Sequence, residues 1–141
     1  FKEMKGMWKC TGMAMGKEIK GTFTAKLDLD KYWIAGTWKS PKTKDAPAMT
    51  GVDYRTYDAS QKKWISTGVD SWGAWSTATS SGPRDGKTLW EGKSGMLGAG
   101  GQMMSVRISE EKVSPKELKM SAEMSMDGKK WGPMWESTCK K

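Results

Sequence analysis

The segment KELKMSAEMSMDG, residues 116–128, shows the fold class most directly. Apolar residues alternate there with polar ones, and the apolar set is Leu118, Met120, Ala122, Met124 and Met126. Successive side chains of a β-strand point to opposite faces, so this period of two predicts a half-buried strand over 116–126. The Asp127-Gly128 pair that follows is typical of a tight hairpin turn.

The same pattern extends through the rest of the chain. Ile19, Phe23 and Leu27 alternate with polar residues in a second clear strand. Stretches rich in Thr, Trp, Tyr, Val and Ile, separated by Gly, Pro, Asp or Ser, predict further strands. We expect ten strands, at 6–14, 18–27, 31–39, 48–57, 62–70, 73–79, 87–95, 101–109, 116–126 and 131–139. No segment shows the sustained 3.6-residue period of a helix.

Ten strands joined by short turns predict antiparallel pairing throughout. An open sheet of that size would leave two long edges unpaired, whereas a closed sheet has none. The 141 residues are enough for one domain. The predicted fold is therefore a single all-β domain over 1–141, an antiparallel up-and-down β-barrel of about ten strands, with a two-sheet sandwich as the alternative.

Two cysteines lie near opposite ends of the chain, Cys10 and Cys139. If the first and last strands are neighbours, a disulfide between them closes almost the whole chain and contributes about 4–5 kcal/mol. Two buried free thiols are the alternative. A disulfide favours an oxidising compartment. The chain opens at Phe1, so we expect either a mature chain after signal-peptide removal, periplasmic or secreted, or a trimmed one.

The composition excludes several function classes. Histidine is absent, which removes imidazole metal sites, His-ligated haem and nucleophile systems that need a histidine base. The net charge of +8 comes almost entirely from lysine, since the arginines are Arg55, Arg84 and Arg107. Base-specific nucleic-acid recognition relies on arginine, so it is not expected. The apolar runs are too short to span a bilayer.

Several motifs resemble a known family. Gly6-Met7-Trp8 is similar to the start of calycin barrels, the superfamily of lipocalins and fatty-acid-binding proteins. The segments at 29–34 and 57–71, with the closing residues 136–141, resemble an uncharacterised bacterial domain-of-unknown-function family with a lipocalin-like barrel. The resemblance covers essentially the whole chain and implies a calycin-like barrel with a ligand cavity. Related ten-stranded barrels of the nitrobindin type hold haem through a histidine, which this chain lacks.

The nine tryptophans and twelve methionines suggest what such an interior would bind. Trp supplies a flat apolar wall with one N–H donor, and Met lines adaptable apolar pockets. Arg55 or Arg107 could anchor an anionic head group through a bidentate pair. The candidate ligand-binding residues are Trp38, Tyr54, Arg55, Trp72, Trp75, Trp90, Met104, Arg107, Met120 and Met124.

Methionine pairs offer a different function. Met13 with Met15 and Met124 with Met126 stand two residues apart, so each pair presents two thioethers to one face, and thioether ligands select Cu(I). These pairs converge only if the first and ninth strands approach each other. A third class is an assembly module whose exposed Met and Trp side chains form a subunit contact.

The sequence thus predicts a secreted or periplasmic barrel that binds a small hydrophobic or amphipathic molecule in a Trp- and Met-lined interior. No spacing brings two carboxylates together for acid–base work, so catalysis is not expected. No cofactor is expected either.

Overall fold

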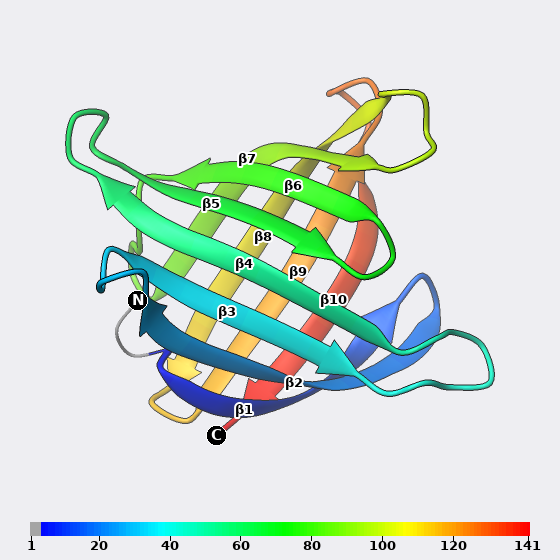
Figure 1. Cartoon of the computed structure of the whole chain (residues 1–141), viewed down its shortest axis with the longest axis horizontal. Coiled ribbons are helices and arrows are strands. Elements are labelled where there is room, and N and C mark those ends of the chain that lie inside the picture. Colours follow the sequence, from blue (N-terminus) through cyan, green and yellow to red (C-terminus); the bar gives the residue numbers. More distant parts are fainter. Residues whose placement is uncertain (1–3) are drawn as a thin grey trace.

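A computed structural model describes residues 4–141 as one closed barrel of ten β-strands (Figure 1). The strands follow the chain in order, and each pairs with the next in antiparallel orientation. Their bounds are β1 Gly6–Ala14, β2 Lys17–Asp28, β3 Trp33–Ser40, β4 Met49–Asp58, β5 Lys63–Asp70, β6 Ala74–Ser80, β7 Lys87–Met96, β8 Met103–Ser114, β9 Glu117–Ser125 and β10 Gly132–Lys140. The predicted up-and-down barrel is confirmed.

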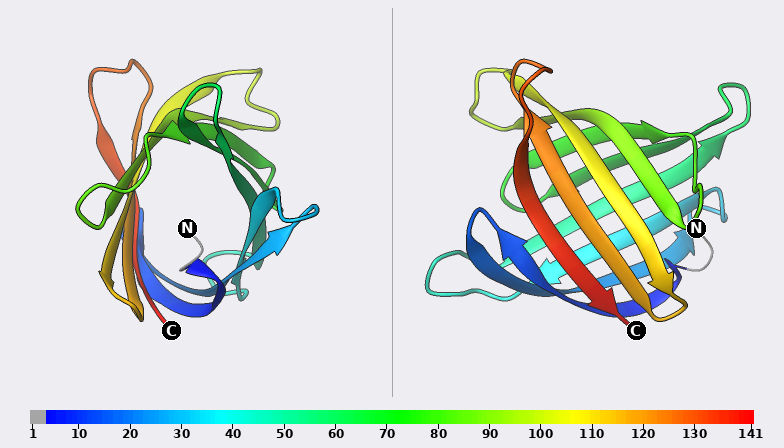
Figure 2. Two further views of the ribbon diagram at one scale, coloured as in Figure 1. Left: turned by 90° about the vertical axis from the view of Figure 1, so that its left-hand side faces the viewer. Right: turned by 180° about the vertical axis from the view of Figure 1, so that it is seen from behind.

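Pairing of β1 with β10 closes the ring, which is visible from one end in Figure 2. Cys10 lies opposite Cys139 in this pairing, and the two form a disulfide, as predicted. The bond links the two ends of the chain at a separation of 129 residues. The closure removes both sheet edges and distinguishes the barrel from the alternative of a sandwich.

The predicted strand ranges agree with the structure to within a few residues, except in β8. The sequence pattern ends that strand at 109, whereas the strand continues to Ser114. Glu110, Glu111 and Lys112 are charged residues beyond the predicted end, yet they pair with β7 and β9. Glu110 is buried because its carboxylate meets Arg55 of β4 inside the barrel.

Directly paired residues share a face, so the register assigns each side chain to the interior or the exterior. Glycine permits close approach of neighbouring strands at two interior positions. A Cβ at Gly12 would overlap the backbone of Glu136, and one at Gly92 would overlap the carbonyl of Thr77. Such glycines let a sheet bend tightly enough to close.

The two ends of the barrel differ. At the end that holds the turns β2–β3, β4–β5 and β8–β9, interior side chains form a dense core. Trp8 is 1% exposed there and donates its indole N–H to the carbonyl of Met4 at 2.9 Å. The core comprises Met4, Trp8, Cys10, Phe23, Ala25, Ile34, Leu118 and Cys139. We call this the closed end, and the opposite one, with the β1–β2, β3–β4, β5–β6, β7–β8 and β9–β10 connections, the open end.

No helix within residues 4–141 is long and apolar enough to cross a membrane.

Candidate functional site

Interior side chains toward the open end are only partly buried. Trp38 of β3 stands on one wall, where it also packs against the core of the closed end, and Met104 of β8 and Met124 of β9 stand on the opposite wall. All three retain partial exposure although they face inward, and interior-facing Met96 is 44% exposed. Solvent therefore contacts part of each of these inward-facing side chains.

Small residues line the remaining wall of this half. The register places them at interior positions of β4 to β7, and they are Gly51, Ser66, Gly68, Ser76, Ala78, Gly92 and Ser94. None of these side chains reaches far toward the barrel axis. This combination of small and large apolar side chains is typical of barrels that hold one small ligand.

A charged cluster lies between the open half and the closed core. The guanidinium of Arg55 donates to Asp53 through Nε at 2.8 Å and to Glu110 through Nη1 at 3.0 Å. Its Nη2 lies 2.7 Å from the other Glu110 oxygen, so the Glu110 contact is bidentate. The guanidinium carbon also lies 4.9 Å from the ring centre of Trp90, which packs beneath it. Arg55, Asp53 and Glu110 therefore form a largely buried polar floor to the open half.

Burial and charge act against each other in this cluster. Burial raises the pKa of the Asp53 carboxyl above 3.8, against the opposing effect of the Arg55 cation. Burial disfavours the charged form of Arg55, but Glu110 and Asp53 outweigh it, and the pKa of Arg55 is raised above its usual value. One cation faces two carboxyl groups here, so the cluster has no excess of positive charge.

Beside the cluster there is little free space. The cavity between Met4, Phe23 and the Asp53–Arg55 pair measures about 10 Å³. A water-sized object fills such a volume.

The structure brings together six of the ten predicted ligand-binding residues at interior positions: Trp38, Arg55, Trp90, Met104, Met120 and Met124. Arg55 was expected to anchor an anionic head group. Its guanidinium is instead engaged by the carboxylates of Asp53 and Glu110. Trp90 is 2% exposed and belongs to the floor.

The other four predicted residues lie elsewhere. Tyr54 points outward and packs edge-on against Trp33, with ring centres 6.4 Å apart. Trp75 also lies outside, over Gly95. Arg107 faces outward and stacks at 3.8 Å over the Trp131 ring. Trp72 is in the β5–β6 turn. A shift of one residue along a strand moves every side chain to the opposite face of the sheet. In these stretches large or polar residues occupy both faces, so alternation alone did not show which side chains point inward.

The structure does not bring the four methionines of the Cu(I) alternative together. Met13 is on the outer face of β1, whereas Met124 is on the inner face of β9. Met15 and Met126 are 70% and 60% exposed in separate connections. Among residues 4–141, no group of three or more Cys, Asp or Glu side chains is arranged to hold a metal ion.

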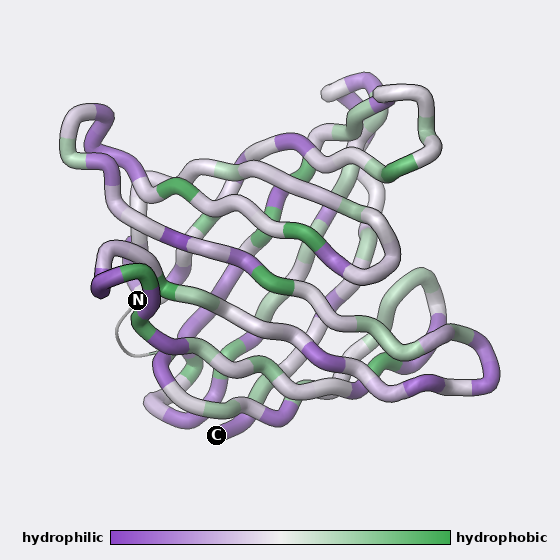
Figure 3. Tube along the Cα trace, in the orientation of Figure 1, coloured by the Kyte–Doolittle hydropathy of each residue, from purple (hydrophilic) through white to green (hydrophobic). Residues whose placement is uncertain are grey.

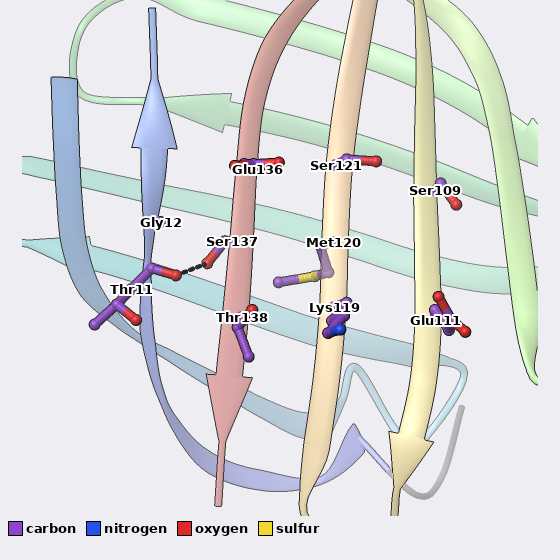
Figure 4. A pocket seen from close by; sticks show the side chains of 10 residues that line it. All are labelled: Thr11, Gly12, Ser109, Glu111, Lys119, Met120, Ser121, Glu136, Ser137 and Thr138. Carbon is purple, nitrogen blue, oxygen red and sulfur yellow. Dashed lines mark hydrogen bonds between the residues drawn. The ribbon is translucent and has the colours of Figure 1, made fainter. Parts of the chain in front are cut away.

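A separate hollow of about 410 Å³ lies against β1, β10, β9 and β8 (Figure 4). Most of its lining belongs to outward-facing positions, among them Thr11, Thr138, Ser121, Lys119 and Glu136. Hydroxyl and charged groups make up most of its lining, and the inward-facing residues Gly12, Met120 and Ser137 complete it. It shares none of the aromatic lining that the sequence predicted for a ligand.

The predicted site residues did not include Glu110 or Asp53, nor Trp135, which faces the interior opposite Ala14 and Ala122. The alternation Met104, Val106, Ile108 would have placed Glu110 inward, had the strand been extended by one more step. Trp135 follows a β-bulge between Pro133 and Trp135, which changes the alternation in β10. No local signal shows that Arg55 meets a residue 55 positions later.

The geometry defines a closed antiparallel barrel with a dense core toward one end and less buried inward-facing side chains toward the other. No protein-family model and no curated protein sequence matches the chain. Among solved structures, Rv2717c from M. tuberculosis is similar, with a TM-score of 0.72, 11% identity and coverage of 99% of this chain and 92% of that one.

Two designed proteins have the same fold. A de novo designed fluorescence-activating β-barrel gives a TM-score of 0.55 at 14% identity, covering 99% of this chain and 94% of that one. The redesigned β-barrel mFAP1, solved bound to DFHBI, gives 0.54 at 13% identity, covering 99% and 96%. These similarities show the barrel fold, while the resemblance to a domain-of-unknown-function family stays a prediction.

Proposed function

We propose that this barrel binds a small hydrophobic or amphipathic molecule that enters through the open end. The observation that carries the proposal is the partial exposure of inward-facing Trp38, Met104 and Met124 above a buried polar floor. A ligand that covers inward-facing apolar side chains removes them from water, which lowers the free energy. The similar designed barrel mFAP1, solved bound to DFHBI, supports this use of the fold.

The polar end of the proposed ligand would meet this floor. A carboxylate head group would approach Arg55 beside Asp53 and Glu110, and like charges at that distance repel. An uncharged group that donates and accepts hydrogen bonds avoids this repulsion. We therefore expect a neutral head group, such as a hydroxyl or an amide, on an apolar body.

The disulfide is compatible with an extracellular or periplasmic location, and we propose that the protein works there as a binding protein without catalysis. The Asp53–Arg55–Glu110 cluster is part of the proposed binding floor. Its two carboxyl groups share one guanidinium, which favours a structural and positioning role over acid–base work.

The test compares decanol with decanoate by tryptophan fluorescence quenching and by native mass spectrometry. The proposal expects retained decanol and at least about tenfold weaker binding of decanoate. Ser76→Leu, which fills the interior, should weaken decanol binding by a similar factor. Thr77→Leu on the outer face of the same strand is the matched control and should bind as the parent does.

Two results would overturn the proposal. The first is absence of binding by both compounds, and the second is equal binding by the Ser76→Leu and Thr77→Leu variants. A preference for decanoate would retain the interior site but contradict the neutral head group.

A further inference from the structure

Exposed apolar side chains gather on the connections at the open end. Trp72 in the β5–β6 turn is 48% exposed, and Leu97 in the β7–β8 loop is 75% exposed. Met96, at the end of β7, is 44% exposed. We call Trp72, Met96 and Leu97 the rim patch.

Hydrogen bonds join the rim patch to its neighbours. The indole N–H of Trp72 donates to the carbonyl of Ala48 in the β3–β4 loop at 3.3 Å. The N–H of Leu97 donates to the carbonyl of Gly73 at 2.9 Å. Three successive connections at the open end are therefore tied together, and the rim patch is one surface and not three separate tips.

Lysines flank this surface. Lys42 and Lys44 are exposed in the β3–β4 loop, the same loop that Trp72 contacts. Figure 3 shows this loop as strongly hydrophilic at the lower right and a hydrophobic segment in the β7–β8 loop at the upper right. The order along the rim is thus basic loop, aromatic turn and aliphatic loop.

The β9–β10 connection repeats the combination. Met126 is 60% exposed, and Lys129 and Lys130 follow it on the surface. The Asp127 carboxylate accepts the backbone N–H groups of both lysines at 2.8 and 2.9 Å, which holds the loop in place. Apolar side chains with lysines beside them therefore occur on both sides of the open end.

We propose that the open end docks on the surface of an anionic lipid bilayer. Trp, Leu and Met side chains enter the interfacial region of a bilayer, and nearby lysines are attracted to anionic head groups. The net charge of +8 adds a long-range attraction to such a surface. Docking goes beyond the proposed ligand binding and does not require it.

A second copy of the chain fits this surface less well. In the β3–β4 and β9–β10 connections Lys42, Lys44, Lys129 and Lys130 outnumber Asp45 and Asp127, so two rims facing each other would each present an excess of positive charge. Like charges across an interface are unfavourable, whereas an anionic bilayer complements them. The charge of the rim therefore selects the lipid surface.

The experiment measures co-sedimentation of the whole protein with two kinds of vesicle, phosphatidylcholine alone and phosphatidylcholine mixed with phosphatidylglycerol. We expect binding to the mixed vesicles that weakens as salt is raised, and little binding to phosphatidylcholine. Leu97→Glu should reduce binding by about tenfold, and the double change Lys42→Glu/Lys44→Glu by about thirtyfold or more.

Matched controls lie away from the open end. Leu89→Glu replaces a leucine that is 49% exposed on the outer face of β7. Lys62→Glu/Lys116→Glu makes the same charge change in the β4–β5 and β8–β9 turns at the closed end. The controls should lose less than about threefold. Native mass spectrometry with decanol, without vesicles, tests the ligand site separately, so either idea can fail alone.

Three outcomes would overturn docking. They are absence of binding to the mixed vesicles, an equal loss in the rim variants and their controls, and a dimer in solution that Leu97→Glu dissociates. The last result would assign the rim to a second copy of the chain.

Discussion

Arg55 of β4 and Glu110 of β8 form a bidentate ion pair across the interior of the barrel, with an Nη2–Oε1 distance of 2.7 Å. These strands are not neighbours in the sheet, so the pair connects two opposed walls. Below it Trp90 and the disulfide-linked core fill the barrel, and above it inward-facing side chains such as Met104 and Met124 are only partly buried. The pair therefore lies between a densely packed half of the barrel and a half whose inward-facing side chains are less buried.

Removal of the Glu110 carboxylate should destabilise the fold. Glu110→Ala leaves Arg55 buried with Asp53 as a remaining carboxylate partner, so we expect a loss of about 3 kcal/mol, the lower end for a broken buried pair. Urea unfolding measures it. Glu111→Ala, at the next position but paired with Lys87 on the exposed outer face, should change stability by less than about 1 kcal/mol. Equal losses would contradict the assigned role.

Asp53 should make stability depend on pH in an unusual direction. Its folded pKa is raised by burial above 3.8, so the folded protein holds this proton after the unfolded chain has released it. The free energy of unfolding should therefore fall as pH rises from 3.8 through the raised value. Asp53→Asn keeps an acceptor for Arg55 and should remove this fall, as judged by urea unfolding across the pH range.

Asp127→Asn is a control in which the expected pH dependence has the opposite direction. The backbone N–H groups of Lys130 and Lys129 lower the pKa of Asp127, so its contribution is present above 3.8 and is lost as pH falls through the lowered value. Each variant is compared with the parent by its free energy of unfolding across the pH range. If the two substitutions changed this pH dependence in the same direction, the account of Asp53 would be contradicted.

The disulfide should contribute strongly because it joins strands at the two ends of the chain. Reduction, or Cys10→Ala/Cys139→Ala, opens a loop of 129 residues, and the loop-entropy model gives about 4–5 kcal/mol. Thermal unfolding with and without reductant measures the loss. The double variant should be insensitive to reductant, and a reduced parent as stable as the oxidised one would rule out this role.

Gly92 tests the tight approach of β6 and β7. A Cβ there would overlap the Thr77 carbonyl, so Gly92→Ala should cost about 1–3 kcal/mol through forced displacement of the strands. Gly132→Ala is the matched control, since a Cβ at Gly132 meets nothing within 4 Å. We expect the control to be neutral or slightly stabilising in urea unfolding.

Local pattern was enough to predict the strands and the barrel. The alternation in residues 116–126 and the turn residues are signals between near neighbours in sequence. A period of two indicates a β-strand whatever the distant parts of the chain do. The terminal cysteines added one long-range constraint, and it was correct. Alternation failed for Tyr54, Trp75 and Arg107, because large or polar side chains there occupy both faces of a strand.

The sequence by itself therefore determined the closed antiparallel sheet, its disulfide and the presence of Trp and Met side chains inside the barrel. Only the tertiary structure decided that Arg55 is occupied by Asp53 and Glu110, and that the rim patch assembles from separate loops. The physical reason is distance along the chain. The charges and apolar groups that make these sites come from strands far apart in sequence, and their meeting depends on how the ring closes.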